Sequence, residues 1–197
     1  MISEDELFDF IDDVRQTKSA LEDQRGLRFG RPGGEKDLEA VSSILGGAPL
    51  YEFGAVLTMM LGPATATVEL LGFDTKLGTN SPAFFKRAID ANPEWYYVNW
   101  LPIAGDGCGG YYIYPITKAS DNARPIFQIR PELGTLDPHR YVASNVLRFI
   151  RRALHAELAE IDDDAFSLEY QREFDPDMPD VVARFERESP IGGVPVN

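Results

Sequence analysis

The sequence predicts an α+β fold in which helices pack on one face of a mostly antiparallel β-sheet. Helical periodicity occupies the first 61 residues and returns after residue 137. Between these regions, runs of aromatic and β-branched residues are separated by short turn-forming segments, which favours adjacent antiparallel strands. The length of 197 residues and the apolar fraction of 44% suit one folded domain with appendages, and exclude a wholly disordered chain.

Three helices are expected before the sheet. The first begins with a capping pattern at Ser3 and ends by Gly26, where glycine and proline open a loop. The second and third are predicted over 35–44 and 51–61, on either side of a Gly-Gly-Ala-Pro break. Gly62-Pro63 ends the third helix, because proline is incompatible with a helix interior.

The strands are expected in the centre of the chain. The segment 65–71 is β-branched and alternating, and Ser81-Pro82 then provides a helix cap and a first helical position for a short amphipathic helix. The clearest strand patterns cover 94–104, 110–117 and 124–130. Short glycine-rich connections between them predict antiparallel pairing.

Two more helices are expected at the C-terminal end. The longest helix is predicted to start at Asp137-Pro138, and its buried stripe is expected to be Val142, Val146, Phe149, Ile150, Leu154 and Leu158. Asp162, Asp163 and Asp164 interrupt that stripe. A short final helix is expected over 181–185.

The predicted central strands are dense in large aromatic residues. Alternation along a strand sends neighbouring side chains to opposite faces, so half of this set should pack under the helices. The other half is either an exposed interaction patch or is covered by further helices or chain extensions, and both alternatives are open. The set consists of Trp95, Tyr96, Tyr97, Trp100, Tyr111, Tyr112 and Tyr114.

The negative charge is concentrated at the C-terminal end. The chain carries 32 acidic and 19 basic side chains, a formal net charge of -13. Residues 1–34 have 8 acidic and 5 basic groups, residues 35–154 have 12 and 11, and residues 155–197 have 12 and 3. An acidic segment of this kind is a solvated appendage, or it steers a basic partner over the Debye length of roughly 8 Å.

Composition excludes several classes of function. The acidity argues against direct nucleic-acid binding, because neutralising phosphates requires a basic surface. The longest apolar run, Ala55 to Leu61, is far shorter than the roughly 20 residues of a bilayer span, so no membrane partner is expected. One cysteine, two histidines and no recognisable secretory pattern suit a cytoplasmic protein without a disulfide or a metal site.

No motif gives a catalytic or cofactor site. Gly105, Gly107 and Gly110 match G-x-G-x-x-G, but a strand follows them where a dinucleotide fold needs a helix, so a tight hairpin is favoured. Cys108 in the same loop has no recognisable activating base, although a Cys108-dependent activity is kept as an alternative. A partial calcium-loop match begins at Asp175 and fails where its turn requires glycine. The expectation is a protein that is not an enzyme and binds no cofactor.

Three segments resemble the SUKH superfamily, which includes the Smi/Knr-type regulators of cell-wall synthesis. EKDLEAVSSILGGAPLYEFGAVLTMMLG at 35–62 resembles the opening helices, WLPIAGDGCGGYYIYPI at 100–116 the central hairpin, and RYVASNVLRFIRRAL at 140–154 the closing helix. Ala48-Pro49 stands where the family usually has leucine-proline, and Leu61 where it has asparagine. The resemblance divides the chain into a helical extension at 1–34, a SUKH-like domain at 35–154 and an acidic extension at 155–197.

The resemblance implies an α+β fold without catalytic apparatus, and a frequent role in bacteria as an immunity protein. We therefore expect a protein-binding module that neutralises a polymorphic toxin, such as a nuclease, by direct binding. The alternative is an intracellular regulatory or scaffold protein of the same fold with a partner that is not a toxin. The candidate partner-binding residues are Glu94, Trp95, Tyr97, Asp106, Tyr112, Asp162, Asp163 and Asp164.

Overall fold

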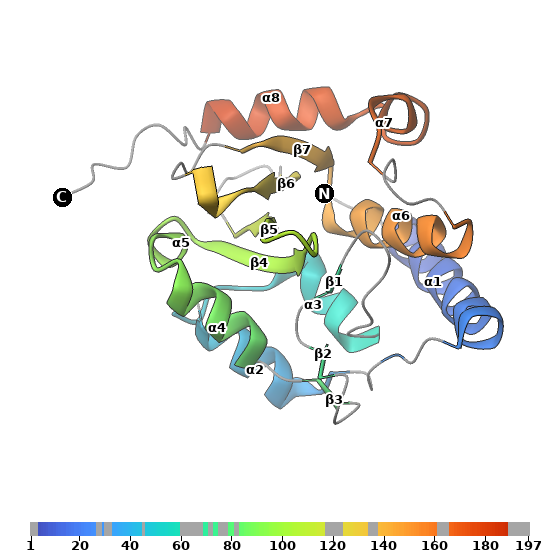
Figure 1. Ribbon diagram of the computed structural model, residues 1–197, viewed down its shortest axis with the longest axis horizontal. Helices are drawn as coiled ribbons and strands as arrows, with labels where there is room; N and C mark the ends of the chain where they lie inside the picture. Colours follow the sequence, from blue (N-terminus) through green and yellow to red (C-terminus); the bar gives the residue numbers. More distant parts are fainter. Residues whose placement is uncertain are drawn as a thin grey trace.

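The sheet lies in the middle of the molecule, with helices at both ends of the chain packed around it (Figure 1). The structure is a computed structural model. It describes residues 4–26, 29, 33–44, 46–59, 69–70, 73–74, 79–80, 83–116, 124–133, 138–160 and 166–188. The predicted cap at Ser3, most of the strand predicted over 65–71, the Ser81-Pro82 helix start and the three aspartates at 162–164 lie outside these residues.

The main sheet is antiparallel and follows the order β1-β4-β5-β6-β7. Every pairing within it is antiparallel, and β4 and β5 form the predicted central hairpin. A separate antiparallel pair joins β2 and β3. The strands are β1 (Glu69–Leu70), β2 (Phe73–Asp74), β3 (Thr79–Asn80), β4 (Trp100–Gly105), β5 (Tyr111–Pro115), β6 (Ile126–Ile129) and β7 (Arg140–Ala143).

Eight helices surround this sheet in the described part of the chain, which confirms the α+β class. The helix predicted over 35–44 is present with those bounds, and the first helix ends before Gly26, whose φ of 65° suits glycine. The helices are α1 (Glu4–Arg25), α2 (Glu35–Ile44), α3 (Tyr51–Met59), α4 (Ala83–Ala91), α5 (Glu94–Tyr97), α6 (Val146–Leu158), α7 (Leu168–Phe174) and α8 (Met178–Glu188). A 3₁₀ turn spans Pro131–Leu133.

Helices cover both faces of the sheet, so the aromatic residues of the strands themselves are covered, and Trp100, Tyr112 and Tyr114 are buried. Tyr112 in β5 packs on Phe149 of α6, with ring centroids 5.0 Å apart. The next residue of β5 points to the opposite face and pairs with Phe127 of β6. On that face Phe127 and Tyr141 of β7 both contact Phe185 of α8. The expected helices on one face of the sheet are present, and α8 covers the other face as well.

The N-terminal and C-terminal helices belong to the same hydrophobic core as the sheet. α1 lies along α6 (Figure 1) and buries Phe10, Val14 and Leu21. At the other end of the chain, Phe166 and Phe185 are buried as well. An apolar core closes only when enough side chains leave water together, so both flanks contribute to the stability of the central sheet.

The strand predicted over 94–104 is wrong in its first half. Glu94–Tyr97 is the four-residue helix α5, and the strand begins only at Trp100. Pro93 precedes this helix in an α conformation, with φ of -64°, and Asn99 at φ of 55° turns the chain into β4. Aromatic composition favours strands, but it does not distinguish a strand from a short helical turn that packs through one large side chain.

The helix predicted from Asp137-Pro138 is also wrong at its start. Arg140–Ala143 is the edge strand β7, and the helix α6 begins at Val146. Asn145 fixes this boundary, because its side chain accepts a hydrogen bond of 2.9 Å from the backbone N–H of Arg148. Among the helices that the structure describes, α1 is the longest, with 22 residues, and α7 is one that the sequence did not predict.

Candidate protein-binding surface

The short helix α5 presents two tyrosines to solvent on a fixed support. Trp95 is buried and packs edge-on against Tyr111 of β5, with ring centroids 5.2 Å apart. Tyr96 and Tyr97 are 43% and 77% exposed, and their rings are in edge contact at 5.7 Å. Asn99 closes the connection to the sheet, since its carbonyl accepts a 2.7 Å hydrogen bond from the N–H of Ile116. The backbone segment that carries the two exposed rings is therefore anchored to the sheet.

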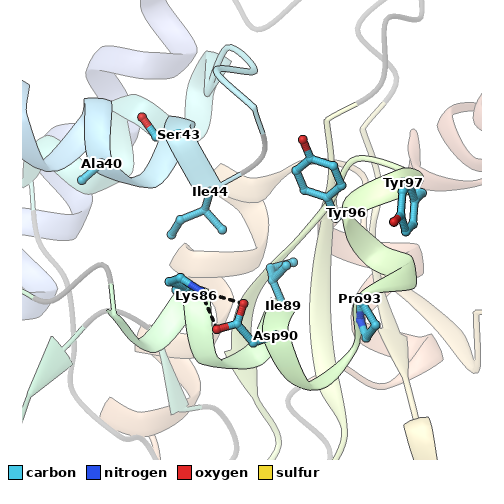
Figure 2. Close-up of a pocket in the computed structure, with 9 residues that line it drawn as sticks. All are labelled: Ala40, Ser43, Ile44, Lys86, Ile89, Asp90, Pro93, Tyr96 and Tyr97. Carbon is cyan, nitrogen blue, oxygen red and sulfur yellow. Dashed lines mark hydrogen bonds and ion pairs between the residues drawn. The ribbon is translucent and has the colours of Figure 1, made fainter.

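These tyrosines border a hollow of about 600 Å³ between α2, α4 and α5, shown in Figure 2. Ile44 of α2 and Ile89 of α4 provide its apolar lining. Lys86 and Asp90, one turn apart on α4, form an ion pair at 2.5 Å at its wall (Figure 2). We call this combined area the tyrosine surface; it consists of Ala40, Ser43, Ile44, Lys86, Ile89, Asp90, Pro93, Tyr96 and Tyr97.

Asp106 shapes the turn of the central hairpin. Its Oδ1 accepts hydrogen bonds from the backbone N–H groups of Cys108, at 2.9 Å, and Gly110, at 2.8 Å. Its Oδ2 accepts a 2.6 Å bond from Nε2 of Gln128 in the neighbouring strand. A Cβ at Gly110 would collide with this carboxylate, so any other residue there would have to displace Asp106 from its hydrogen bonds. The glycine-rich loop joins two strands, in agreement with the hairpin interpretation.

The structure separates the predicted partner-binding residues into several groups. Glu94 and Tyr97 are exposed on α5, as a contact role requires. Trp95 and Tyr112 are buried core residues, so their assignment to a partner-binding surface is corrected. Burial also raises the pKa of the Tyr112 phenol, an effect that the neighbouring Arg140 opposes. The carboxylate of Asp106 accepts hydrogen bonds from its own loop and from Gln128, so it is occupied within the chain.

Tyr96 and the hollow beside it are not among the binding features predicted from the sequence. A strand would send Tyr96 and Tyr97 to opposite faces, whereas the helical turn leaves both exposed. The segment Asn92-Pro93-Glu94 indicates a helix rather than a strand, because proline followed by an acidic residue is typical of a helix start. The isoleucines of the hollow come from two helices and are brought together only by tertiary packing.

The structure also places Cys108 and the partial calcium motif. Cys108 is exposed, and its backbone N–H is bound to Asp106. Asp175, in the partial calcium motif, accepts hydrogen bonds from the N–H of Ser144 at 2.7 Å and from Arg148 at 2.5 Å. Within the part of the chain that the structure describes, no group of three or more histidine, cysteine or acidic residues could hold a metal ion. In the same part, no helix has the length and apolar character needed to cross a membrane.

Comparison of the chain with protein families and with curated proteins finds no match.

Proposed function

We propose that this protein is a non-catalytic protein-binding module, and specifically an immunity protein that neutralises a bacterial polymorphic toxin, such as a nuclease, by direct binding. The observation that carries the proposal is the pair of exposed tyrosines on α5, next to a hollow with an apolar lining. The resemblance of residues 35–154 to SUKH domains directs the proposal to the immunity role.

Physical chemistry supports a binding role for the tyrosine surface. Tyrosine is enriched among the residues that dominate binding energy, since one ring buries a large area and its hydroxyl forms hydrogen bonds. A tyrosine also has few rotatable bonds, so little conformational entropy is lost when a partner covers it. The packing of Trp95 under Tyr96 and Tyr97 fixes the backbone that carries them. The apolar lining of the hollow suits an apolar side chain of the partner.

The charge of the chain supports a basic partner. A net charge of -13 attracts a positively charged domain and accelerates its association, most strongly at low salt. Nuclease domains are commonly basic because they bind phosphates. The exposed carboxylate of Glu94 lies on the same helix as the two tyrosines and suits a basic group at the edge of the contact.

The decisive experiment is to identify any toxin-like protein encoded next to the gene, to co-express it with this protein, and to measure growth and the dissociation constant. Replacing both Tyr96 and Tyr97 by alanine should abolish protection and weaken binding by about 2–4 kcal/mol, or roughly 30- to 1,000-fold. Phe8→Ala is the matched control, because Phe8 is an exposed aromatic residue on α1. Cys108→Ala should leave protection unchanged if no catalysis is involved.

Two results would overturn this proposal. Full protection by the double tyrosine variant would show that the contact lies elsewhere. A neighbouring toxin that is not neutralised, together with a stable complex with a cellular protein, would select the regulatory or scaffold role instead.

A further inference from the structure

A second cleft lies between α1, α6 and α7, at the opposite end of the molecule from α4 and α5 in the view of Figure 1. Its volume is about 860 Å³, larger than that of the hollow at the tyrosine surface. We call it the α7 cleft. Its lining includes carboxylates from α1, arginines from α6 and two aromatic rings from α7: Asp5, Asp9, Arg148, Arg151, Arg152, Tyr170 and Phe174.

The arginines of the α7 cleft are already engaged within the chain. Arg148 donates to Asp175 at 2.5 Å and forms a second ion pair with Asp177 at 3.2 Å. Arg151 pairs with Asp13 of α1 at 2.6 Å. Because their positive charge is neutralised locally, an anionic ligand would have to displace these carboxylates and would gain little.

Unlike the arginines, two carboxylates on the α1 side of the cleft have no ion-pair partner among the described residues. Asp5 and Asp9 are both exposed and lie one helical turn apart on α1, so they share one face of that helix. Neither forms a salt bridge or a side-chain hydrogen bond with any residue that the structure describes. These two carboxylates are therefore available to a cation that enters the cleft.

The aromatic side of the cleft is a stack of planar groups with one open end. The guanidinium of Arg152 lies over the ring of Tyr170, 3.6 Å from its centroid. The ring of Tyr170 stacks in turn on Phe174, with centroids 4.7 Å apart and planes inclined by 23°. Phe174 ends the stack and is 56% exposed. An arginine guanidinium is planar and stacks on aromatic faces, so it is the group that fits this open ring.

We propose that the α7 cleft binds an arginine-containing basic segment of a partner protein. One guanidinium stacks on Phe174, and the carboxylates of Asp5 and Asp9 neutralise the positive charge of the segment. Charge complementarity selects this occupant. Asp5 and Asp9 have no ion-pair partner among the described residues, whereas Arg148 and Arg151 are paired with carboxylates and Arg152 lies over the ring of Tyr170. The site lies apart from the tyrosine surface and does not depend on the proposed immunity function.

The test is an NMR titration of the full chain with a model peptide, acetyl-Gly-Arg-Gly-Arg-Gly-amide, at low salt. Resonances of Phe174, Tyr170 and the first two turns of α1 should shift with a saturable dependence on peptide concentration. The equivalent lysine peptide should bind more weakly, because ammonium does not stack, and the citrulline peptide should not bind, because it is uncharged. Binding of the arginine peptide should weaken in 0.5 M salt.

Variants distinguish the cleft from general attraction to an acidic protein. Phe174→Ala should weaken binding roughly threefold through loss of the cation–π contact. The double variant Asp5→Asn, Asp9→Asn should weaken it about fivefold. Leu168→Ala, an exposed residue of α7, is the control for Phe174, and Asp12→Asn, an exposed aspartate of α1, is the control for the charges. Circular dichroism verifies the fold of each variant.

Several results would overturn the proposal. Equal effects of the cleft and control variants would show binding to diffuse surface charge only. Equal binding of the citrulline peptide, or shifts confined to other residues, would exclude a guanidinium site in the α7 cleft. By contrast, loss of toxin protection in the Tyr96, Tyr97 variant with unchanged peptide binding would support the proposal, because it would show that the two sites act separately.

Discussion

Replacing Phe185 by alanine tests whether the acidic C-terminal segment is part of the folding unit. Phe185 lies in α8, within the segment 155–197 that the sequence pattern sets apart as an acidic extension. Its side chain is fully buried, and its ring contacts Phe127 at 5.9 Å and Tyr141 at 6.4 Å. Phe127 is in turn in edge contact with Trp100 at 5.0 Å, so a cavity at Phe185 would reach the centre of the sheet.

The expected loss of stability follows from this burial. Removing a buried phenylalanine side chain loses its transfer free energy and leaves a cavity, at a total cost of about 3–5 kcal/mol. With a urea dependence at the upper end of about 1–3 kcal/mol per molar, the unfolding midpoint should fall by roughly 1–2 M. Leu168→Ala in α7 is the control, because its side chain is 70% exposed and its removal should change stability by less than about 0.5 kcal/mol.

The measurement is urea unfolding at neutral pH, followed by tryptophan fluorescence. Both tryptophans, Trp95 and Trp100, are buried in or beside the central sheet, so they report on the core rather than on α8 itself. A midpoint shift of less than about 0.5 M, which corresponds to about 1.5 kcal/mol with the same urea dependence, would refute the reasoning. It would show that α8 is an appendage whose contacts with β6 and β7 contribute little to the fold.

Three further predictions concern the turn, a helix boundary and the buried phenols. Asp106→Ala should lower the free energy of unfolding by about 1–3 kcal/mol in urea titrations, since it leaves two loop N–H groups and Gln128 without their acceptor, and a neutral result would contradict that role. Asn145→Ala should cost about 1 kcal/mol in the same titrations by removing the cap of α6, whereas an unchanged midpoint would place the boundary elsewhere. Burial raises the pKa of Tyr114 above its ordinary value of 10.0, with Glu52 adding to the effect, so its neutral form stabilises the fold fully below about pH 10 and this contribution is lost as the pH rises further. The urea midpoint should therefore fall less between pH 8 and pH 11 for Tyr114→Phe than for the unchanged protein, and equal falls would argue against this linkage.

The packing of α8 also changes how electrostatic steering is tested. Deleting residues 155–197 would remove Phe166 and Phe185 from the core together with the acidic charge. A slower association of such a truncated chain would therefore not separate charge from folding. Replacing exposed acidic residues such as Glu173 and Asp180 by their amides removes charge and keeps the core, so the association rate then reports on steering alone.

Much of the fold is encoded in local patterns. Glycine at position 26, the Gly-Gly break before α3 and the glycine-rich turn after β4 mark real boundaries, because each requires a backbone conformation that other residues rarely adopt. The buried stripe of α6 from Val146 onward follows from its 3.6-residue period. The central hairpin follows from two aromatic strands joined by a short turn.

What the sequence alone determined is therefore the α+β class, the central antiparallel hairpin and most helix positions, since these depend on short-range periodicity and turn chemistry. Tertiary structure alone decided which aromatic residues face solvent. Trp95 and Tyr97 are two residues apart and chemically alike, yet one is buried against Tyr111 and the other is the most exposed aromatic residue described. The physical reason is that burial depends on which distant elements pack against a side chain, and that arrangement is absent from any local segment of the chain.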